Sequence, residues 1–243
     1  MNGKRNFFPW AVVALLACGL TVPASWASDD PRDLSYKEQV TLNSQTFLDA
    51  HPDMKYRKTG WEAYERQDYV VARGEFTKAA SYGDKVSQAM LAEMSWKGQG
   101  APADHVLAYV WADLAAERGY PTFLALRELY WRELNEGERA DALVRGRPLL
   151  LEYGADATTD RLTRHLRKHL QRIKFSSMTA APPREVRIVD YHGSVVRIDG
   201  SRFFAPKFWD PVKYQAWQDA QWKDLPEGKV DVGDVEPVRS VQP

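Results

Sequence analysis

The sequence predicts a mainly α-helical protein: an α-α superhelix of helical hairpins, followed by a small β-hairpin and helix at the C-terminal end. The first observation is a repeat in which five residues recur 36 positions later without a gap. Asp68, Ala72, Ala79, Ala80 and Gly83 are matched by Asp104, Ala108, Ala115, Ala116 and Gly119. The second is a change of apolar spacing beyond residue 183, from helical to the alternation of strands. A repeat of this length is typical of stacked helical hairpins, which usually bind other chains.

The first repeat unit carries the fuller pattern of small and aromatic residues. Gly60 lets two helices approach closely, Tyr64 fills the space at the end of the first helix, and Phe76 lies in the second helix. The series Gly60, Tyr64, Asp68, Tyr69, Ala72, Phe76 and Ala79 resembles the tetratricopeptide repeat.

The second unit differs in the length of its loop. Trp96 and Asp104 are eight positions apart, whereas Tyr64 and Asp68 are four apart, and the longer loop contains Gly98 and Gly100. This loop and the small residues after it resemble the Sel-one-like repeat of the tetratricopeptide-like superfamily. The resemblance covers about residues 53–133 and, with the N-terminal segment, leads us to expect an exported bacterial protein.

The resemblance implies a non-catalytic scaffold that binds another protein or a peptide in a groove lined by the first helix of each hairpin. The groove positions of the family fall on seven residues of this chain: Arg57, Trp61, Tyr64, Glu65, Glu93, Trp96 and Lys97. Any of them could instead pack between repeats, which is the favoured role for Tyr64. Two complete units would make only a shallow groove.

Residues 1–27 have the layout of a secretory signal. Lys4 and Arg5 precede an apolar stretch, and Ala27 ends a Ser-Trp-Ala site with small residues at both cleavage-determining positions. We therefore expect cleavage after Ala27 and a periplasmic protein. The alternative is an outer-membrane lipoprotein, because Cys18 follows a Leu-Leu-Ala sequence like that of a lipoprotein signal.

Composition restricts the class of partner. Cys18 is the only cysteine, so cleavage after Ala27 would leave a chain without disulfides. Removing Lys4 and Arg5 leaves 31 basic and 33 acidic residues, a net charge of −2. This charge argues against nucleic acid as a partner. The expected partner is another envelope protein or peptide.

Capping residues and breakers place the remaining helices. We expect a helix over 34–50, hairpins over 53–66 with 69–82 and 86–97 with 103–118, and two helices over 121–134 and up to 153 that form a third, capping hairpin. Asp160 is expected to cap a basic helix, Arg161 to Lys174. These elements make a repeat domain over 33–175.

Beyond this domain the sequence predicts a linker over 176–183, an extension over 184–224 and a mobile acidic tail over 225–243. In the extension, the stretches 185–191 and 194–198 alternate as strands and Arg202 to Phe204 add a third. A helix over 210–223 follows.

The sequence offers little for chemistry. It has no nucleophile elbow, and cleavage of the signal after Ala27 is expected to remove Cys18. His165 and His169 share one helix face, but six basic residues surround them and oppose a metal cation. We expect no catalytic residues, no metal site and no cofactor.

The basic helix has a second possible role. Leu162, Leu166, Leu170 and Ile173 form a stripe that we expect to pack inward. The alternatives are that the helix lies on an anionic membrane, meets an acidic partner, or receives the acidic tail.

An aromatic cluster lies in the C-terminal extension: Phe203, Phe204, Phe208, Trp209, Tyr214, Trp217 and Trp222. We expect these rings to form a core, private to the extension or shared with the last hairpin, because so small a module needs large side chains to fold. The alternative function is a cell-wall binding module, in which Trp209, Trp217 and Trp222 stack on peptidoglycan sugars.

Overall fold

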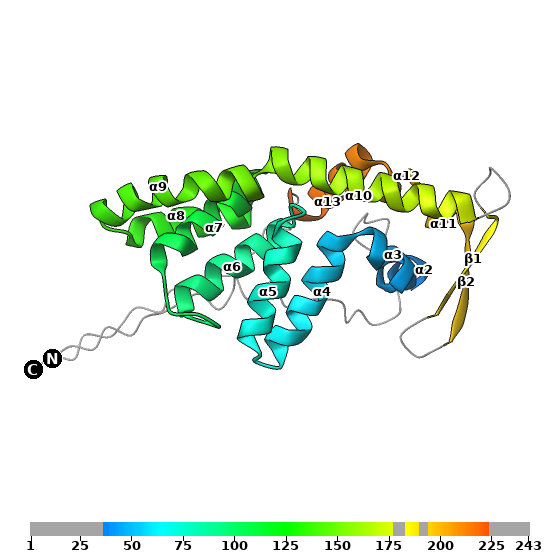
Figure 1. Cartoon of the computed structure of the whole chain (residues 1–243), viewed down its shortest axis with the longest axis horizontal. Helices are drawn as coiled ribbons and strands as arrows, with labels where there is room; N and C mark the ends of the chain where they lie inside the picture. The colour runs from blue at the N-terminus through cyan, green and yellow to red at the C-terminus, as the bar shows by residue number, and fades with distance from the viewer. Residues whose placement is uncertain (1–35, 177–182, 190–193, 224–243) are drawn as a thin grey trace, which may run out of the picture.

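The computed structural model of the chain describes residues 36–176, 183–189 and 194–223 (Figure 1). The predicted signal over 1–27, most of the linker over 176–183 and the acidic tail over 225–243 lie outside the described residues. The fold is mainly α-helical with one two-stranded sheet, as the sequence predicts.

Two short helices precede the repeats: α2 (Tyr36–Asn43) and α3 (Gln45–Ala50). The sequence predicts one helix here, but Ser44 divides it. The side chain of Ser44 accepts a hydrogen bond from the backbone N–H of Phe47 and so caps α3.

The two predicted hairpins are present, with bounds within two residues of those expected. They are α4 (Pro52–Glu65) with α5 (Tyr69–Ala80), and α6 (Lys85–Lys97) with α7 (His105–Ala116). Asp68, Asp84 and Asp104 each accept a backbone N–H at the start of the following helix. This cap satisfies one of the free amides that every helix start presents.

Small residues set the packing within and between hairpins. A Cβ added at Gly60 would lie 2.7 Å from the ring of Phe76, so only glycine fits there. Four alanines of the repeat pattern are buried at helix contacts: Ala79, Ala80, Ala115 and Ala116. The repeat register read from the sequence is therefore the register of the fold.

Helices α8 (Pro121–Glu133) and α9 (Glu136–Tyr153) do not form a third hairpin like the first two. Both pack on α7, and α9 contacts α7 more than it contacts α8. A capping box between Asn135 and Glu138 starts α9, and Pro148 lies inside the helix without ending it.

Helix α10 (Ala155–Ser176) starts five residues before the predicted cap at Asp160, which lies within the helix. It follows α9 almost at once and runs back along one long edge of the array to α3, α12 and α13 (Figure 1). The chain thereby returns from the last helices of the array to its first.

The C-terminal segment begins with an antiparallel pair, β1 (Glu185–Val189) and β2 (Val195–Asp199), in which Val186 faces Ile198. The prediction of a third strand is wrong, because Asp199 caps a helical turn, α11 (Gly200–Phe203). A second turn, α12 (Pro206–Trp209), and the predicted final helix, α13 (Pro211–Lys223), follow.

Residues from both ends of the described chain share one core. Phe47 of α3 packs with Ile188, Ile198, Phe203, Phe208 and Trp209. The expectation of a private core or of docking on the last hairpin is therefore wrong for most of these rings. Trp222 alone among them belongs to the core of the hairpins.

Candidate functional site

Three aromatic side chains run along the end of the first hairpin. Trp61 meets Tyr64 edge-on with ring centroids 5.7 Å apart, and Tyr64 meets Tyr69 of α5 at 5.3 Å. Trp61 also rests edge-on against Phe76 at 5.8 Å. All three rings of the row are half-buried, and Glu65 beside them is exposed. The row therefore packs on the hairpin and still presents part of its surface.

The second hairpin meets this row through α6 and its loop. The hydroxyl of Tyr64 donates a hydrogen bond of 3.2 Å to Oε1 of Gln99. Burial raises the pKa of Tyr64, and the charge of nearby Glu93 adds to this shift. Glu93 is buried and pairs with exposed Lys97. Of the seven predicted positions, the structure brings these close to one another: Trp61, Tyr64, Glu65, Glu93 and Lys97.

Trp96 lies in a stack of three rings. The centroid of its indole ring lies 4.1 Å from that of His105 and 4.2 Å from that of Tyr130. The ring planes are nearly parallel in both pairs. This stack joins α6, α7 and α8. Trp96 thus has a packing role, and binding by Trp96 stays a prediction.

An open hollow of about 610 Å³ lies beside the long loop and His105. Its lining includes Arg73, which donates a hydrogen bond of 3.3 Å to Ser95 and has no carboxylate within ion-pairing distance among the described residues. Asp104, also in the lining, pairs with Arg145 of α9. The hollow lies between the first hairpin, the long loop of the second and the start of α9.

Arg57 lies one helical turn before Trp61 on α4 but takes part in a different contact. It donates a hydrogen bond of 2.8 Å to Oδ1 of Asp84, the N-cap of α6. This ion pair joins the start of the second hairpin to the middle of α4, so Arg57 has a structural role.

Sequence reasoning did not find a buried polar cluster beside Arg57. Oδ2 of Asp53 accepts hydrogen bonds from Tyr214 at 2.6 Å and from Gln218 at 3.2 Å. Burial raises the pKa of Asp53. In the sequence, Asp53 reads only as a helix-start acid after His51-Pro52, so no local signal points to α13.

His51 adds a second link between the two ends. Its Nδ1 lies 2.8 Å from the carbonyl oxygen of Phe47, and its Nε2 lies 2.7 Å from that of Phe208. The ring stacks on that of Phe47 at 3.7 Å. A buried histidine therefore fastens α12 to α3.

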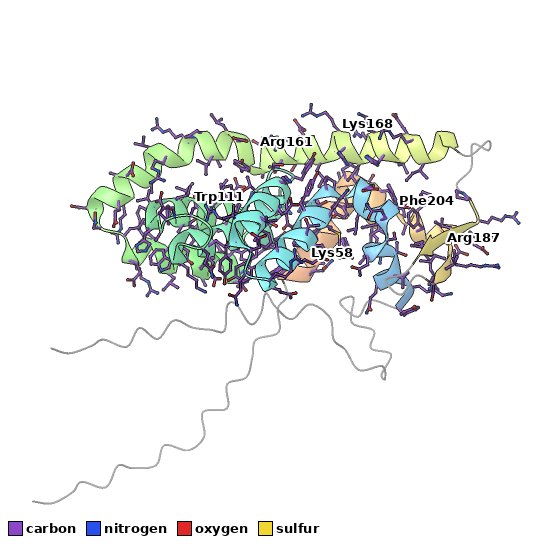
Figure 2. All side chains as sticks on the ribbon, turned by 60° about the horizontal axis from the view of Figure 1, so that its bottom comes forward. Lys58, Trp111, Arg161, Lys168, Arg187 and Phe204 are labelled. Atoms are coloured by element: carbon purple, nitrogen blue, oxygen red, sulfur yellow. The ribbon has the colours of Figure 1, made fainter. Side chains whose placement is uncertain are left out.

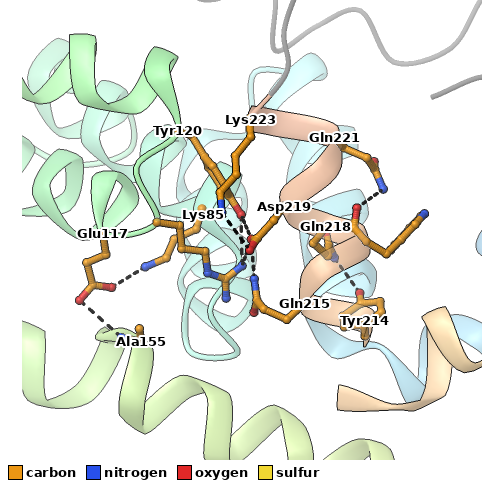
Figure 3. Close-up of polar contacts among 12 residues, drawn as sticks. Lys85, Glu117, Tyr120, Ala155, Tyr214, Gln215, Gln218, Asp219, Gln221 and Lys223 are labelled. Atoms are coloured by element: carbon orange, nitrogen blue, oxygen red, sulfur yellow. Dashed lines mark hydrogen bonds and ion pairs between the residues drawn. The ribbon is translucent and has the colours of Figure 1, made fainter. Parts of the chain in front are cut away.

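Helix α13 makes further polar contacts with the array, which Figure 3 shows. Asp219 accepts a hydrogen bond of 2.6 Å from Tyr120 and one of 2.8 Å from Gln215. Trp222 stacks on Phe123 of α8 at 5.5 Å. Helix α13 thus contacts α4 at one point and the start of α8 at another.

The tryptophans of the glycan alternative differ in exposure. Trp209 is 4% exposed, and its indole N–H donates a hydrogen bond of 2.6 Å to the carbonyl of Phe203. Trp217 and Trp222 are half-buried. The structure therefore places Trp209 in the core and leaves only Trp217 and Trp222 with ring surface for a sugar.

The leucine stripe of α10 packs inward, as the sequence predicts. Leu162 and Leu166 are buried, and Leu170 and Ile173 pack on the shared core. Arg161 and Lys168 are among the basic residues of this helix (Figure 2). Of its arginine and lysine side chains that the structure describes, at positions 161, 164, 167, 168 and 172, none forms an ion pair with a described carboxylate. The exposed face of α10 is thus basic and lacks an apolar anchor.

His165 and His169 stack on each other at 4.5 Å, and Nε2 of His165 lies 3.0 Å from the carbonyl of Asp49. Within residues 36–176, 183–189 and 194–223, no three histidine, cysteine or carboxylate side chains gather as metal ligands. No helix in the same residues is both long and apolar enough to span a membrane.

Comparison with known proteins gives one weak structural likeness. A protective antigen of uropathogenic Escherichia coli that displays an SLR fold is 19% identical, with a TM-score of 0.40. The likeness covers 54% of this chain and 27% of that protein. No protein-family model and no curated protein matches the chain. A likeness at this level does not indicate what the chain binds.

Proposed function

We propose that this chain is a non-catalytic scaffold of the bacterial cell envelope that holds another protein or a peptide on the surface of its helical hairpins. The observation that supports this most is the row of half-buried rings of Trp61, Tyr64 and Tyr69, flanked by exposed Glu65 and Lys97. Aromatic rings that are already held in place lose little freedom on binding and carry much of the energy of protein interfaces.

Site-specific crosslinking in living cells tests this proposal. A photoreactive amino acid at position 65 or 97 should capture one discrete partner, while the same group at Glu133, which is exposed on α8, should not. Trp61→Ala should reduce capture from position 65 because it removes the ring at one end of the row. Equal capture from all three positions, or none from 65 and 97, would contradict the proposal.

The proposed location is the periplasm. It is supported by the signal-like layout of residues 1–27, with an outer-membrane lipoprotein anchored at Cys18 as the alternative. N-terminal sequencing of the protein from envelope fractions separates the outcomes. A chain that starts at Ser28 supports simple cleavage, a blocked Cys18 supports the lipoprotein, and an intact Met1 contradicts export.

The glycan alternative is tested by Trp217→Ala. Trp217 packs edge-on against Phe208 at 5.3 Å, so we expect the substitution to lower hydrogen-exchange protection across 184–223. Sedimentation with purified peptidoglycan is measured on the same protein. Full protection combined with lost sedimentation would favour the cell-wall module over the scaffold.

The exposed basic face of α10 supports an electrostatic contact with an acidic partner or an anionic membrane as a further possibility for the same scaffold. Because its leucines are held in the core, such a contact would depend on charge alone. Co-sedimentation with vesicles that contain anionic lipid should then be lost at high salt.

A further inference from the structure

The outward face of α9 carries apolar side chains that no other described residue covers. Four of its side chains are among the most exposed large apolar groups of the described residues: Leu143 at 64%, Val144 at 67%, Leu150 at 52% and Leu151 at 81%. Since a helix turns once in 3.6 residues, these positions form a single stripe. We call these four side chains the α9 stripe.

The α9 stripe points away from the array. On the other side of the helix Ala142 is buried, and a Cβ at Gly146 would contact Val110 of α7. Helix α10 leaves α9 at Gly154 and continues away from it along the edge of the molecule (Figure 1), and the four side chains of the stripe stay exposed. An array that stands alone needs a polar outer face at its end, whereas four exposed side chains on this face are apolar.

The order of residues along the stripe is symmetric about Arg147. Val144 and Leu150 lie three positions before and after it, and Leu143 and Leu151 lie four positions before and after it. Seven positions before Arg147 stands Ala140, an exposed residue small enough to let a second helix approach. A face that reads the same in both directions is what a two-fold interface between identical helices requires.

We propose that the α9 stripe binds the same stripe of a second copy of this chain, with the two helices antiparallel and a two-fold axis at Arg147. Leu143 then meets the partner's Leu151, and Val144 meets the partner's Leu150. The two Arg147 side chains lie near the axis, and their length lets the guanidinium groups reach solvent on either side. A contact of one helix from each copy is small, so the dimer forms weakly and reversibly.

This dimer does not depend on the proposed envelope function, since it is measured on the purified chain alone. Cys18 is the only cysteine, so a Cys18→Ser chain accepts single cysteines at chosen positions. A disulfide requires two Cα atoms within about 7 Å. Mild oxidation should link Arg147→Cys to itself, and should link Leu143→Cys to Leu151→Cys only when the two chains are mixed.

Each other result of the crosslinking contradicts the proposal. If Leu143→Cys and Leu151→Cys each link to themselves and not to each other, the helices are parallel. If no pair links, the stripe is covered by something else, such as the chain's own residues 224–243 or a different protein, and the purified chain remains a monomer.

Sedimentation velocity gives an independent measurement. Leu151→Glu should weaken dimerisation by on the order of ten-fold or more, because it places a charge in the apolar contact. Arg147→Leu should strengthen it by removing two like charges from the axis. The matched control is Val70→Glu on α5, whose side chain is also 70% exposed and lies outside the stripe.

Circular dichroism of the three variants confirms that each is folded before dimerisation is compared. A Leu151→Glu chain that dimerises as well as the Val70→Glu chain would overturn the interface. An Arg147→Leu chain that dimerises no more tightly than the parent would overturn the position of the axis.

Discussion

The hydroxyl of Tyr214 donates a hydrogen bond of 2.6 Å to Oδ2 of Asp53, although the two residues are 161 positions apart. Both side chains are buried, and Gln218 donates to the same oxygen. The other carboxylate oxygen of Asp53 has no hydrogen-bond partner among the described residues. This contact joins the C-terminal helix to the first hairpin. The loss of either donor would leave the buried carboxylate of Asp53 with a single hydrogen bond from a described residue.

Tyr214→Phe should therefore destabilise the protein. The substitution keeps the ring but removes one of the two hydrogen bonds to Oδ2 of Asp53, which retains Gln218. A hydrogen bond contributes about 0.5–1.5 kcal/mol between neutral groups and about 1.5–3 kcal/mol when one group is charged. Urea unfolding measures the loss. Tyr36→Phe, at an exposed tyrosine, is the control and should change little. Equal stability of the two variants would show that the Asp53 contact contributes nothing.

Ala115→Leu tests the register of the repeats. Ala115 is fully buried between helices, and three added carbons should cost about 1–3 kcal/mol through overpacking. Ala125→Leu, at an exposed position of α8, should be nearly neutral. Thermal unfolding of both variants is compared with the parent, and an unchanged melting temperature for Ala115→Leu would contradict the packing described here.

Gly100→Ala tests how closely the long loop approaches the first hairpin. Gly100 has a φ of +74°, and an added Cβ would collide with the backbone carbonyl of Tyr69. Gly119 has nearly the same φ, +73°, but open space around it. Both alanine variants bear the strain of a left-handed residue, about 1–2 kcal/mol. Only Gly100→Ala adds a collision, so its loss of unfolding free energy should be clearly larger.

The repeats could be predicted because their signals are local. Capping aspartates, a glycine at each turn and alanines at helix contacts recur in one register, and the structure places the hairpins within two residues of the prediction. The prediction of a third strand was wrong because the local signal there fits two structures. Asp199-Gly200 looks like a turn between strands, but the aspartate caps a helical turn and the glycine lies against the backbone of Pro183.

The closure of the chain could not be predicted because it depends on pairs far apart in sequence. Neither Phe47 nor His51 carries a mark that identifies Phe208 as its partner, and Asp53 does not identify Tyr214. The candidate binding residues show a similar limit. The family pattern selects Trp96 and Arg57, but only the structure shows that one lies in a ring stack and the other in an ion pair.

Lys85 gives the stability of this protein a dependence on alkaline pH. Its ammonium group is buried and donates to Oε2 of Glu117 at 2.6 Å, to the carbonyl of Leu114 at 2.6 Å and to Gln88 at 2.9 Å (Figure 3). Burial lowers the pKa of Lys85 to about 8, against the partial compensation of the Glu117 charge. The pKa of a lysine in the unfolded chain is about 10.4.

Between these two pKa values the unfolded chain binds more protons than the folded one, so stability rises with pH. Below about pH 8 both states are protonated and the contribution is constant. From pH 7 to about 9.5 the free energy of unfolding should rise by about 2 kcal/mol. The measurement stops there because burial raises the pKa of Tyr120 and Tyr130 in the folded protein. Above about pH 10 the unfolded chain therefore loses tyrosine protons that the folded protein keeps, which lowers stability. Urea unfolding between pH 7 and about 9.5 measures the rise. Lys85→Met should abolish the rise in stability with pH. Lys168→Met, at an exposed lysine, is the control and should keep the rise. If the rise survives in Lys85→Met, another titrating group causes it.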